Sequence, residues 1–198
     1  MAGVVPAAVN AELDRARERY RSFEERLDPR QRRLLHAFLF LARFTALAAP
    51  FYLVLGSGWD ATGVRAATAD VAAALLRAAG IGASSTGTFV AAGELLVDVT
   101  RDSTGWKSVS VFTALVLASR RPLRTRLWGI AAGAAALLAV NVLRIWSMVY
   151  AVTVFGVGYE LLHTLLWRWG LTASVIAAWL LWMDFSAESP RFARWPGR

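Results

Sequence analysis

The stretch "LWGIAAGAAALLAVNVLRIWSMVYAVTVFG", residues 127–156, is a long apolar run interrupted by few polar residues. It exceeds the ~20 residues with which an α-helix crosses the hydrocarbon core of a bilayer. Arg144 lies about 25 Å along such a helix from Leu127, at ~1.5 Å per residue, in a core ~30 Å thick. The stretch therefore predicts a transmembrane helix that carries a cation near one end.

The composition extends this prediction to most of the chain. Of the 198 residues, 57% are hydrophobic, with nine Trp and ten Phe. A soluble domain of this length is rarely so apolar, whereas this composition is typical of a small polytopic membrane protein. We predict an all-α polytopic membrane protein with about four transmembrane helices, at residues 34–55, 104–119, 127–150 and 161–184.

Several classes of site are excluded by residue types that the chain lacks. The absence of cysteine excludes disulfides, thiolate metal ligands and a thiol nucleophile. The two histidines, His36 and His163, are too few and too far apart in sequence to suggest zinc. We therefore predict no metal and no cofactor. The N-terminus lacks the pattern of a cleaved signal peptide, so insertion is expected to rely on the internal helices.

The net charge of +8 comes from arginines that flank apolar segments rather than from a separate basic domain, so no nucleic-acid partner is predicted. Residues 1–33 hold eight Arg and six acids, and residues 120–126 hold four Arg and no acid. Residues 56–102 hold three Arg and five acids. The positive-inside rule then predicts a plasma-membrane protein whose residues 56–102 lie outside and whose two termini are cytoplasmic. The basic tail 185–198 would lie in the cytoplasm.

The cytoplasmic segment 1–33 is predicted to contain a charged amphipathic helix at residues 9–28, ended by Pro29. Its apolar residues recur at alternating spacings of three and four: Leu13, Ala16, Tyr20, Phe23 and Leu27. Three heptads do not decide between a solvated helix with one apolar stripe and a helix that pairs with itself or lies on the membrane surface.

The outer region between the first two spans is predicted to be an extracytoplasmic amphipathic helix and a short β-hairpin, at residues 62–100. The helix ends at Gly80, and it should lie flat on the outer membrane surface. The hairpin turns around residues 91–93 in "GTFVAAGELLVDVT", and in its second strand Asp98, Thr100 and Asp102 share a face. One side of the helix carries Val64, Ala67, Val71, Leu75 and Ala78.

Three polar residues converge at the outer ends of the predicted spans. Ser103 precedes the second span, Arg144 lies near the outer end of the third, and His163 lies at the start of the fourth. Ionisable groups within membrane segments are costly and are often functional. Helical spacing adds neighbours on the same faces: Lys107 and Ser110 with Ser103, Asn141 with Arg144, and Glu160 with His163.

Each of these residues also has a structural interpretation. Ser103 or Asp102 would serve as the N-cap of the second span, and Arg144 would extend to lipid phosphates. His163 would be an interfacial side chain, and Asn141 would bridge helices by hydrogen bonding. These interpretations do not explain why all of the groups lie at one depth.

The alternative is chemistry at this level of the membrane. His163 is the residue suited to take the proton of the Ser103 hydroxyl near neutral pH. The Arg144 guanidinium would hold an oxyanion or a substrate carboxylate. Either Asp98 or Asp102 would orient His163 or position Arg144, and Thr104 is a neighbouring alternative hydroxyl.

The sequence also resembles a known family. The segments "LLRAAGIGAS", "LLVDVTRDSTGWKSV", "NVLRIW" and "ELLHTLLWRWG" resemble, in this order, the exosortase/archaeosortase family, over roughly residues 62–184. The resemblance implies a polytopic membrane transpeptidase with an outward-facing active site. Its substrates would be exported proteins with a C-terminal signal made of a short motif, a transmembrane helix and a basic cluster. The acyl group would pass to a lipid or envelope polymer.

The family's triad is Cys, Arg and commonly His, which the resemblance places at Ser103, Arg144 and His163. The chain departs from the family by carrying Ser at position 103. Three interpretations follow: a natural serine enzyme, an inactive relative that binds sorting-signal helices or lipid head groups, or an engineered replacement of cysteine. A serine intramembrane protease of unrelated fold is a weaker hypothesis, because such sites usually lie deeper in the membrane.

Overall fold

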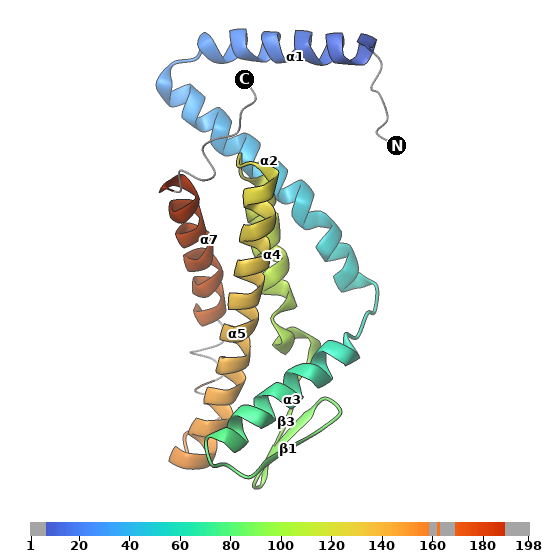
Figure 1. Ribbon diagram of the computed structural model, residues 1–198, viewed down its shortest axis with the longest axis vertical. Helices are drawn as coiled ribbons and strands as arrows, with labels where there is room; N and C mark the ends of the chain where they lie inside the picture. Colours follow the sequence, from blue (N-terminus) through green and yellow to red (C-terminus); the bar gives the residue numbers. More distant parts are fainter. Residues whose placement is uncertain (1–6, 159–161, 163–168, 189–198) are drawn as a thin grey trace. The chain divides into compact units, whose positions relative to one another are not determined.

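The computed structural model describes residues 7–158, 162 and 169–188. The chain divides into two compact units, Met1–Arg43 and Phe44–Arg198, which are considered separately. Helix α2 passes from the first unit into the second. Figure 1 shows the course of the chain and the labels of its elements.

The first unit contains α1 (Ala7–Glu25) and the beginning of α2 (Pro29–Gly56). Helix α1 ends earlier than predicted, because Asp28 begins the next helix. The Asp28 carboxylate accepts a bond of 2.8 Å from the backbone N–H of Gln31, whose side chain accepts a return bond of 3.2 Å from the Asp28 N–H. This is a capping box, and Pro29 occupies the first helical position, where a missing N–H costs little. Leu27 therefore lies outside α1.

Two described helices are long and apolar enough to cross a membrane, Pro29–Val54 within α2 and the whole of α5 (Leu123–Phe155). Helix α4 (Trp106–Ala118) and helix α7 (Leu171–Glu188) are apolar but shorter. The four predicted spans thus correspond in part to described helices, with α5 longer and α4 shorter than expected. Four membrane crossings remain a prediction.

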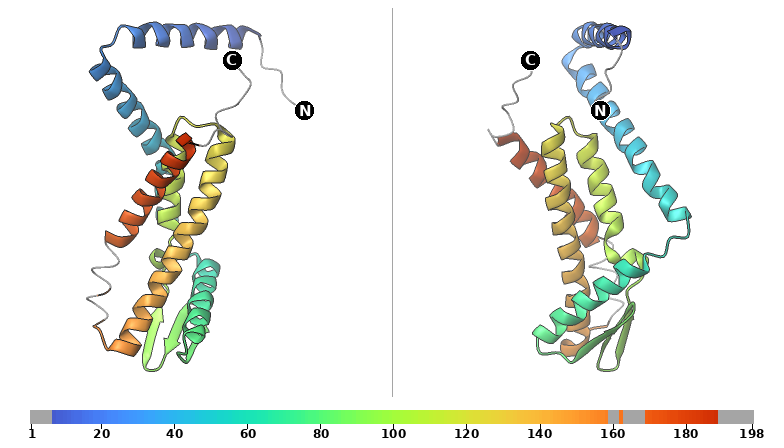
Figure 2. Two further views of the ribbon diagram at one scale, coloured as in Figure 1. Left: turned by 60° about the vertical axis from the view of Figure 1, so that its left-hand side comes forward. Right: turned by 45° about the vertical axis from the view of Figure 1, so that its right-hand side comes forward.

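In the second unit, α4, α5 and α7 lie side by side as a bundle (Figures 1 and 2). Glycines allow the close approach of these helices. A Cβ at Gly133 of α5 would lie 2.1 Å from Cε1 of Phe112 on α4, and one at Gly129 would lie 2.1 Å from Nε1 of Trp182 on α7. Small residues at such positions let apolar helices pack without a clash. The bundle core contains Phe112, Val116, Leu137 and Val175.

The replacement Gly133→Ala is expected to destabilise this bundle by about 1–3 kcal/mol, the usual cost of overpacking a core. The ring of Phe112 is fully buried in the bundle core, and the added Cβ would lie against it. Thermal unfolding of the detergent-solubilised protein measures the effect. Gly63→Ala is the matched control, because no atom lies within 4 Å of the added Cβ. A second change, Phe112→Leu, should recover part of the loss, and its failure to do so would contradict the proposed contact.

At the end of the bundle away from the α4–α5 connection, the chain forms a small antiparallel sheet (Figures 1 and 2). Its strands, in spatial order, are β1 (Ala83–Thr86), β2 (Phe89–Ala92) and β3 (Leu95–Asp98). The predicted hairpin corresponds to β2 and β3. Strand β1 was not predicted, because "ASST" is small and polar and lacks the apolar alternation of a typical strand.

Helix α3 (Thr62–Ala78) packs on the sheet and on α5 through an alanine-rich side. The buried residues of this side are Ala69, Ala72, Ala73 and Leu76, and they share one core with Val90, Val99, Ile145 and Val149. The stripe identified from the sequence lies elsewhere: Val64, Val71 and Leu75 are exposed. Three alanines and Leu76 therefore make these core contacts, whereas Val64, Val71 and Leu75 are left at the surface.

Candidate functional site

Ser103 lies on a short 3-10 turn, η1 (Arg101–Thr104), between β3 and α4. The residue that separates η1 from α4 is Gly105, whose φ of 79° places it in the left-handed region that favours glycine. Gly105 is the N-cap of α4, and no side chain caps that helix. The prediction that Ser103 or Asp102 caps the second span is therefore wrong, because Gly105, with its left-handed backbone conformation, lies between them and the start of α4.

Asn141 of α5 holds this turn in place. Its Nδ2 donates a hydrogen bond of 2.7 Å to the backbone carbonyl of Ser103, and the Asn141 side chain is fully buried. A Cβ at Gly105 would lie 3.0 Å from both Cβ and Cγ of Asn141. Glycine is thus needed at position 105 for its backbone conformation and for its contact with Asn141.

Arg144 follows Asn141 by one helical turn and is 6% exposed. The next residue, Ile145, lines a small pocket together with Ser103, Asp98, Met148 and three valines of the sheet region and α5. The structure therefore places Ser103 beside the segment of α5 that carries Arg144. Of the predicted site residues, Ser103, Asn141 and Arg144 gather at this junction.

The hydroxyl groups of the turn have different environments. The Ser103 Oγ lies 2.9 Å from the Thr100 Oγ1, and Ser103 is partly exposed. Thr104, in contrast, is 1% exposed, and its hydroxyl donates a bond of 2.9 Å to the carbonyl of Arg101. The Thr104 hydroxyl stabilises the turn, so of these two neighbours Ser103 is the one whose hydroxyl a ligand would reach.

The two candidate acids have basic partners. Asp98 forms an ion pair of 3.1 Å with Arg65 and accepts a bond of 2.8 Å from the Thr88 hydroxyl. Asp102 forms an ion pair of 2.8 Å with Lys107. Asp98 also lines the pocket that contains Ser103. Through these ion pairs, both carboxylates have a structural role in addition to any role in the candidate site.

Arg65 is a residue that the sequence analysis did not identify. Its guanidinium bonds four residues of three segments: Nε donates to the carbonyl of Val99 at 2.8 Å, and Nη1 lies 2.8 Å from Asp60. Its Nη2 bonds Asp98 at 3.1 Å and Thr88 at 3.3 Å. The partners lie up to 34 residues away in sequence, so local spacing gives no signal for them. Arg65 fixes the strand that leads into the Ser103 turn.

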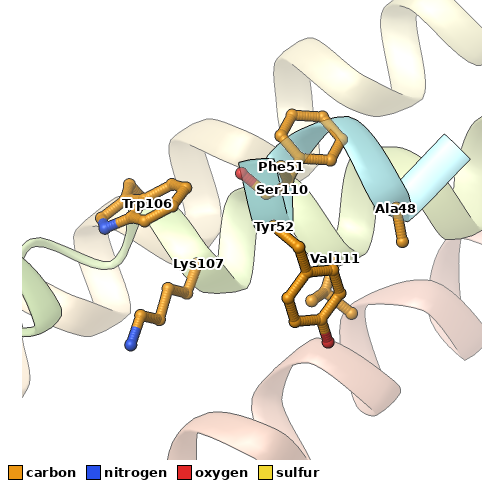
Figure 3. Close-up of a pocket in the computed structure, with 7 residues that line it drawn as sticks. All are labelled: Ala48, Phe51, Tyr52, Trp106, Lys107, Ser110 and Val111. Atoms are coloured by element: carbon orange, nitrogen blue, oxygen red, sulfur yellow. The ribbon is translucent and has the colours of Figure 1, made fainter. Parts of the chain in front are cut away.

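Lys107 and Ser110 do not share a surface with Ser103. They line a separate, apolar pocket between α2 and α4, shown in Figure 3. The prediction of one common face is wrong, because Gly105 ends the helical register between Ser103 and Lys107. The other residues of this pocket are Ala48, Phe51, Tyr52, Trp106 and Val111.

His163 and Glu160 lie outside the described residues, so the structure does not place the predicted base. Within the described part of the chain, no group of three His, Asp or Glu side chains is arranged to hold a metal ion.

The connection before α3 contains a carboxyl with a shifted pKa. The Thr62 hydroxyl, which donates a bond of 2.7 Å to Asp60, is the main cause that lowers the Asp60 pKa below its ordinary value of 3.8, and Arg65 adds to it. A lowered folded-state pKa contributes stability above the unfolded value, and this contribution is lost as the pH falls through the folded value.

The expected result is that acidification from about pH 5 to about pH 3 lowers the Tm of the parent protein more than that of Asp60→Asn. The difference should be small, because the carboxylate is exposed and solvent screens it. An equal fall in Tm for both proteins would show that Asp60 does not contribute.

Taken together, long apolar helices, a small sheet at one end and a polar turn held on the longest helix define a mostly helical membrane protein. Residues 30–183 match the family model described as transmembrane exosortase (Exosortase_EpsH), and the chain belongs to this family. The match includes Ser103 and Arg144, and membership supports a role of the membrane-transpeptidase type in general. No curated protein and no solved structure matches the chain.

Proposed function

We propose that this protein is a transpeptidase or peptidase that processes the C-terminal sorting signals of exported proteins, with Ser103 at the nucleophile position. The observation that carries the proposal is the bond from Asn141 to the carbonyl of Ser103, which holds the turn against α5 beside Arg144. Family membership supplies the class of reaction.

The proposed topology has four spans, both termini in the cytoplasm and the Ser103 turn on the extracytoplasmic side. The Arg-rich segment 120–126 covers the end of the α4–α5 connection and the first turn of α5, and it lies at the end of the bundle opposite the sheet (Figure 2). This separation supports the assignment of the two ends to opposite faces of the membrane, because arginine-rich loops prefer the cytoplasm.

In the proposed reaction, the Ser103 Oγ attacks the scissile carbonyl and its proton passes to His163. The guanidinium of Arg144 stabilises the oxyanion that develops, and the amine leaves with the proton from His163. The acyl group then passes to a nucleophilic acceptor, a lipid or an envelope polymer, or to water. Each step uses groups of this chain and of its substrates.

A second candidate function is capture of sorting-signal helices or lipid head groups without catalysis. The observation that favours it is the Ser103 hydroxyl, whose hydrogen-bond partner among the described residues is the Thr100 hydroxyl. In this case Arg144 and Lys107 bind the ligand and Ser103 has no chemical role.

The test uses an exported reporter that ends in a short motif, a transmembrane helix and a basic cluster, expressed together with the protein. Mass spectrometry of the reporter should show a new C-terminus, and Ser103→Ala should abolish it. Ser110→Ala is the matched control, because this serine lines the other pocket. A reporter with an intact C-terminus, or one processed equally by Ser103→Ala, would count against catalysis. Capture that survives Ser103→Ala but not Arg144→Ala would support the second function.

A further inference from the structure

Helix α1 carries an apolar stripe in the first unit of the chain. Val9, Leu13, Ala16, Tyr20 and Phe23 occupy the a and d positions of successive heptads in the sequence. Val9 is 44% exposed and Phe23 is 53% exposed, so both large side chains lie at the surface of the unit. We propose that α1 pairs in parallel with the α1 of a second copy of this chain.

The charges beside the stripe favour this partner and this direction. Glu12 and Arg19 occupy g positions, and Arg17 and Glu24 occupy e positions. In a parallel pair, each g residue faces the e residue five places later on the partner. Glu12 then faces the partner's Arg17, and Arg19 faces the partner's Glu24. Both pairs have opposite charge.

An antiparallel pair gains less from these charges. With Ala16 opposite Tyr20 of the partner, Arg17 would face Arg17 and Arg19 would face Arg19, and like charges at such positions disfavour an arrangement. With Ala16 opposite Leu13, Glu12 would face Arg19, but Arg17 would face the uncharged Asn10. The parallel pair joins opposite charges at both positions, so the charge pattern favours it.

The structure leaves three of these four charged groups exposed, and the fourth, Glu24, is partly buried. Glu12, Arg17 and Arg19 are exposed, and the ion pair of 3.1 Å between Arg17 and Asp14 is a surface contact of little energy. Glu24 binds His36 through its Oε1 at 2.8 Å. That contact uses one of the two carboxylate oxygens and fixes the Glu24 side chain.

The membrane surface is a poorer partner for this helix. Helices that adsorb to anionic lipid have a polar side rich in Lys and Arg. Between Ala7 and Glu25, α1 holds four Arg against five acidic residues, so it has no net positive charge. Anchoring in one membrane also raises the effective concentration of a second copy, which helps a short helix to pair.

The absence of cysteine from the chain gives a direct test. Single replacements Ala16→Cys and Phe23→Cys, both at d positions, are oxidised in membranes that contain the full-length protein. We expect disulfide-linked dimers from both, since paired d positions suit the Cα separation of a disulfide. Ser22→Cys, which lies beside Phe23 on the outer side of the helix, should give a yield of disulfide-linked dimer about tenfold lower. Equal yields from Ser22→Cys and Phe23→Cys, or no dimer from any variant, would overturn the proposal.

Charge exchange tests the direction of the pair. Added to Ala16→Cys, Arg17→Glu places two acids opposite each other and should lower the dimer yield about tenfold. The further change Glu12→Arg restores opposite charge and should restore the yield. A yield that Arg17→Glu leaves unchanged, or that Glu12→Arg fails to restore, would contradict the parallel pair. These measurements require no enzymatic activity, so their outcome is independent of the proposed function.

Discussion

Replacing Ser103 with cysteine is expected to raise the rate of reporter processing by about 100-fold, because a thiol gives up its proton to a base such as His163 more readily than a hydroxyl does, and general-base catalysis contributes effects of this size. A thiol is partly ionised at neutral pH and is a strong nucleophile in that form, whereas a hydroxyl requires a base. The described partner of the Ser103 hydroxyl is Thr100, which is not a base. The nearby guanidinium of Arg144 would favour the thiolate. The change is nearly isosteric, so the bond from Asn141 to the backbone carbonyl should persist.

The rate is measured from the time course of the reporter's new C-terminus in isolated membranes. Because the chain has no other cysteine, a thiol-alkylating reagent should inactivate Ser103→Cys and leave the parent protein unaffected. Ser110→Cys, on α4, controls for alkylation at a neighbouring position. A rate for Ser103→Cys below that of the parent would contradict the expected gain and show that the site is shaped for a hydroxyl rather than for a thiol.

The sequence predicted those parts of the fold that depend on local pattern. Long apolar runs gave the main helices, and the turn residues around Gly93 gave the hairpin of β2 and β3. Strand β1 was not predicted, because a strand of small polar residues is defined by its pairing with β2 rather than by its own pattern. The buried side of α3 was not predicted either, because Ala69 and Ala72 carry much less apolar area than the exposed Val71.

At the candidate site, the sequence predicted that the Ser103 turn lies close to the Arg144 segment of α5, but not how the chain holds the turn there. The level shared by Ser103 and Arg144 followed from counting residues along predicted spans. The left-handed conformation of Gly105 could not be predicted in this way, because the sequence around it does not fix its φ angle. Nor could the pair of Arg65 and Asp98, which joins residues 33 apart in sequence. Such contacts depend on the tertiary arrangement.

The replacement Arg144→Met is expected to lower processing of the reporter by a factor of about 10²–10³, the usual effect of removing a donor to a developing oxyanion. Methionine keeps much of the length and the apolar stem of arginine but removes the charge and all five donors. Arg144→Lys keeps a charge without the planar fork, so it should retain an intermediate rate. The measurement is the same time course of reporter cleavage.

A loss of stability must be separated from a loss of function, because Arg144 is buried. Arg126→Met is the matched control at the other end of α5, where Nη1 of Arg126 donates a bond of 3.0 Å to the carbonyl of Leu117. This variant should lower Tm and keep the reporter cleavage rate. Added guanidinium should restore part of the activity of Arg144→Ala, which a purely structural loss would not allow. Full activity in Arg144→Met would instead assign Arg144 to helix packing or lipid contact, and the proposed oxyanion role would be wrong.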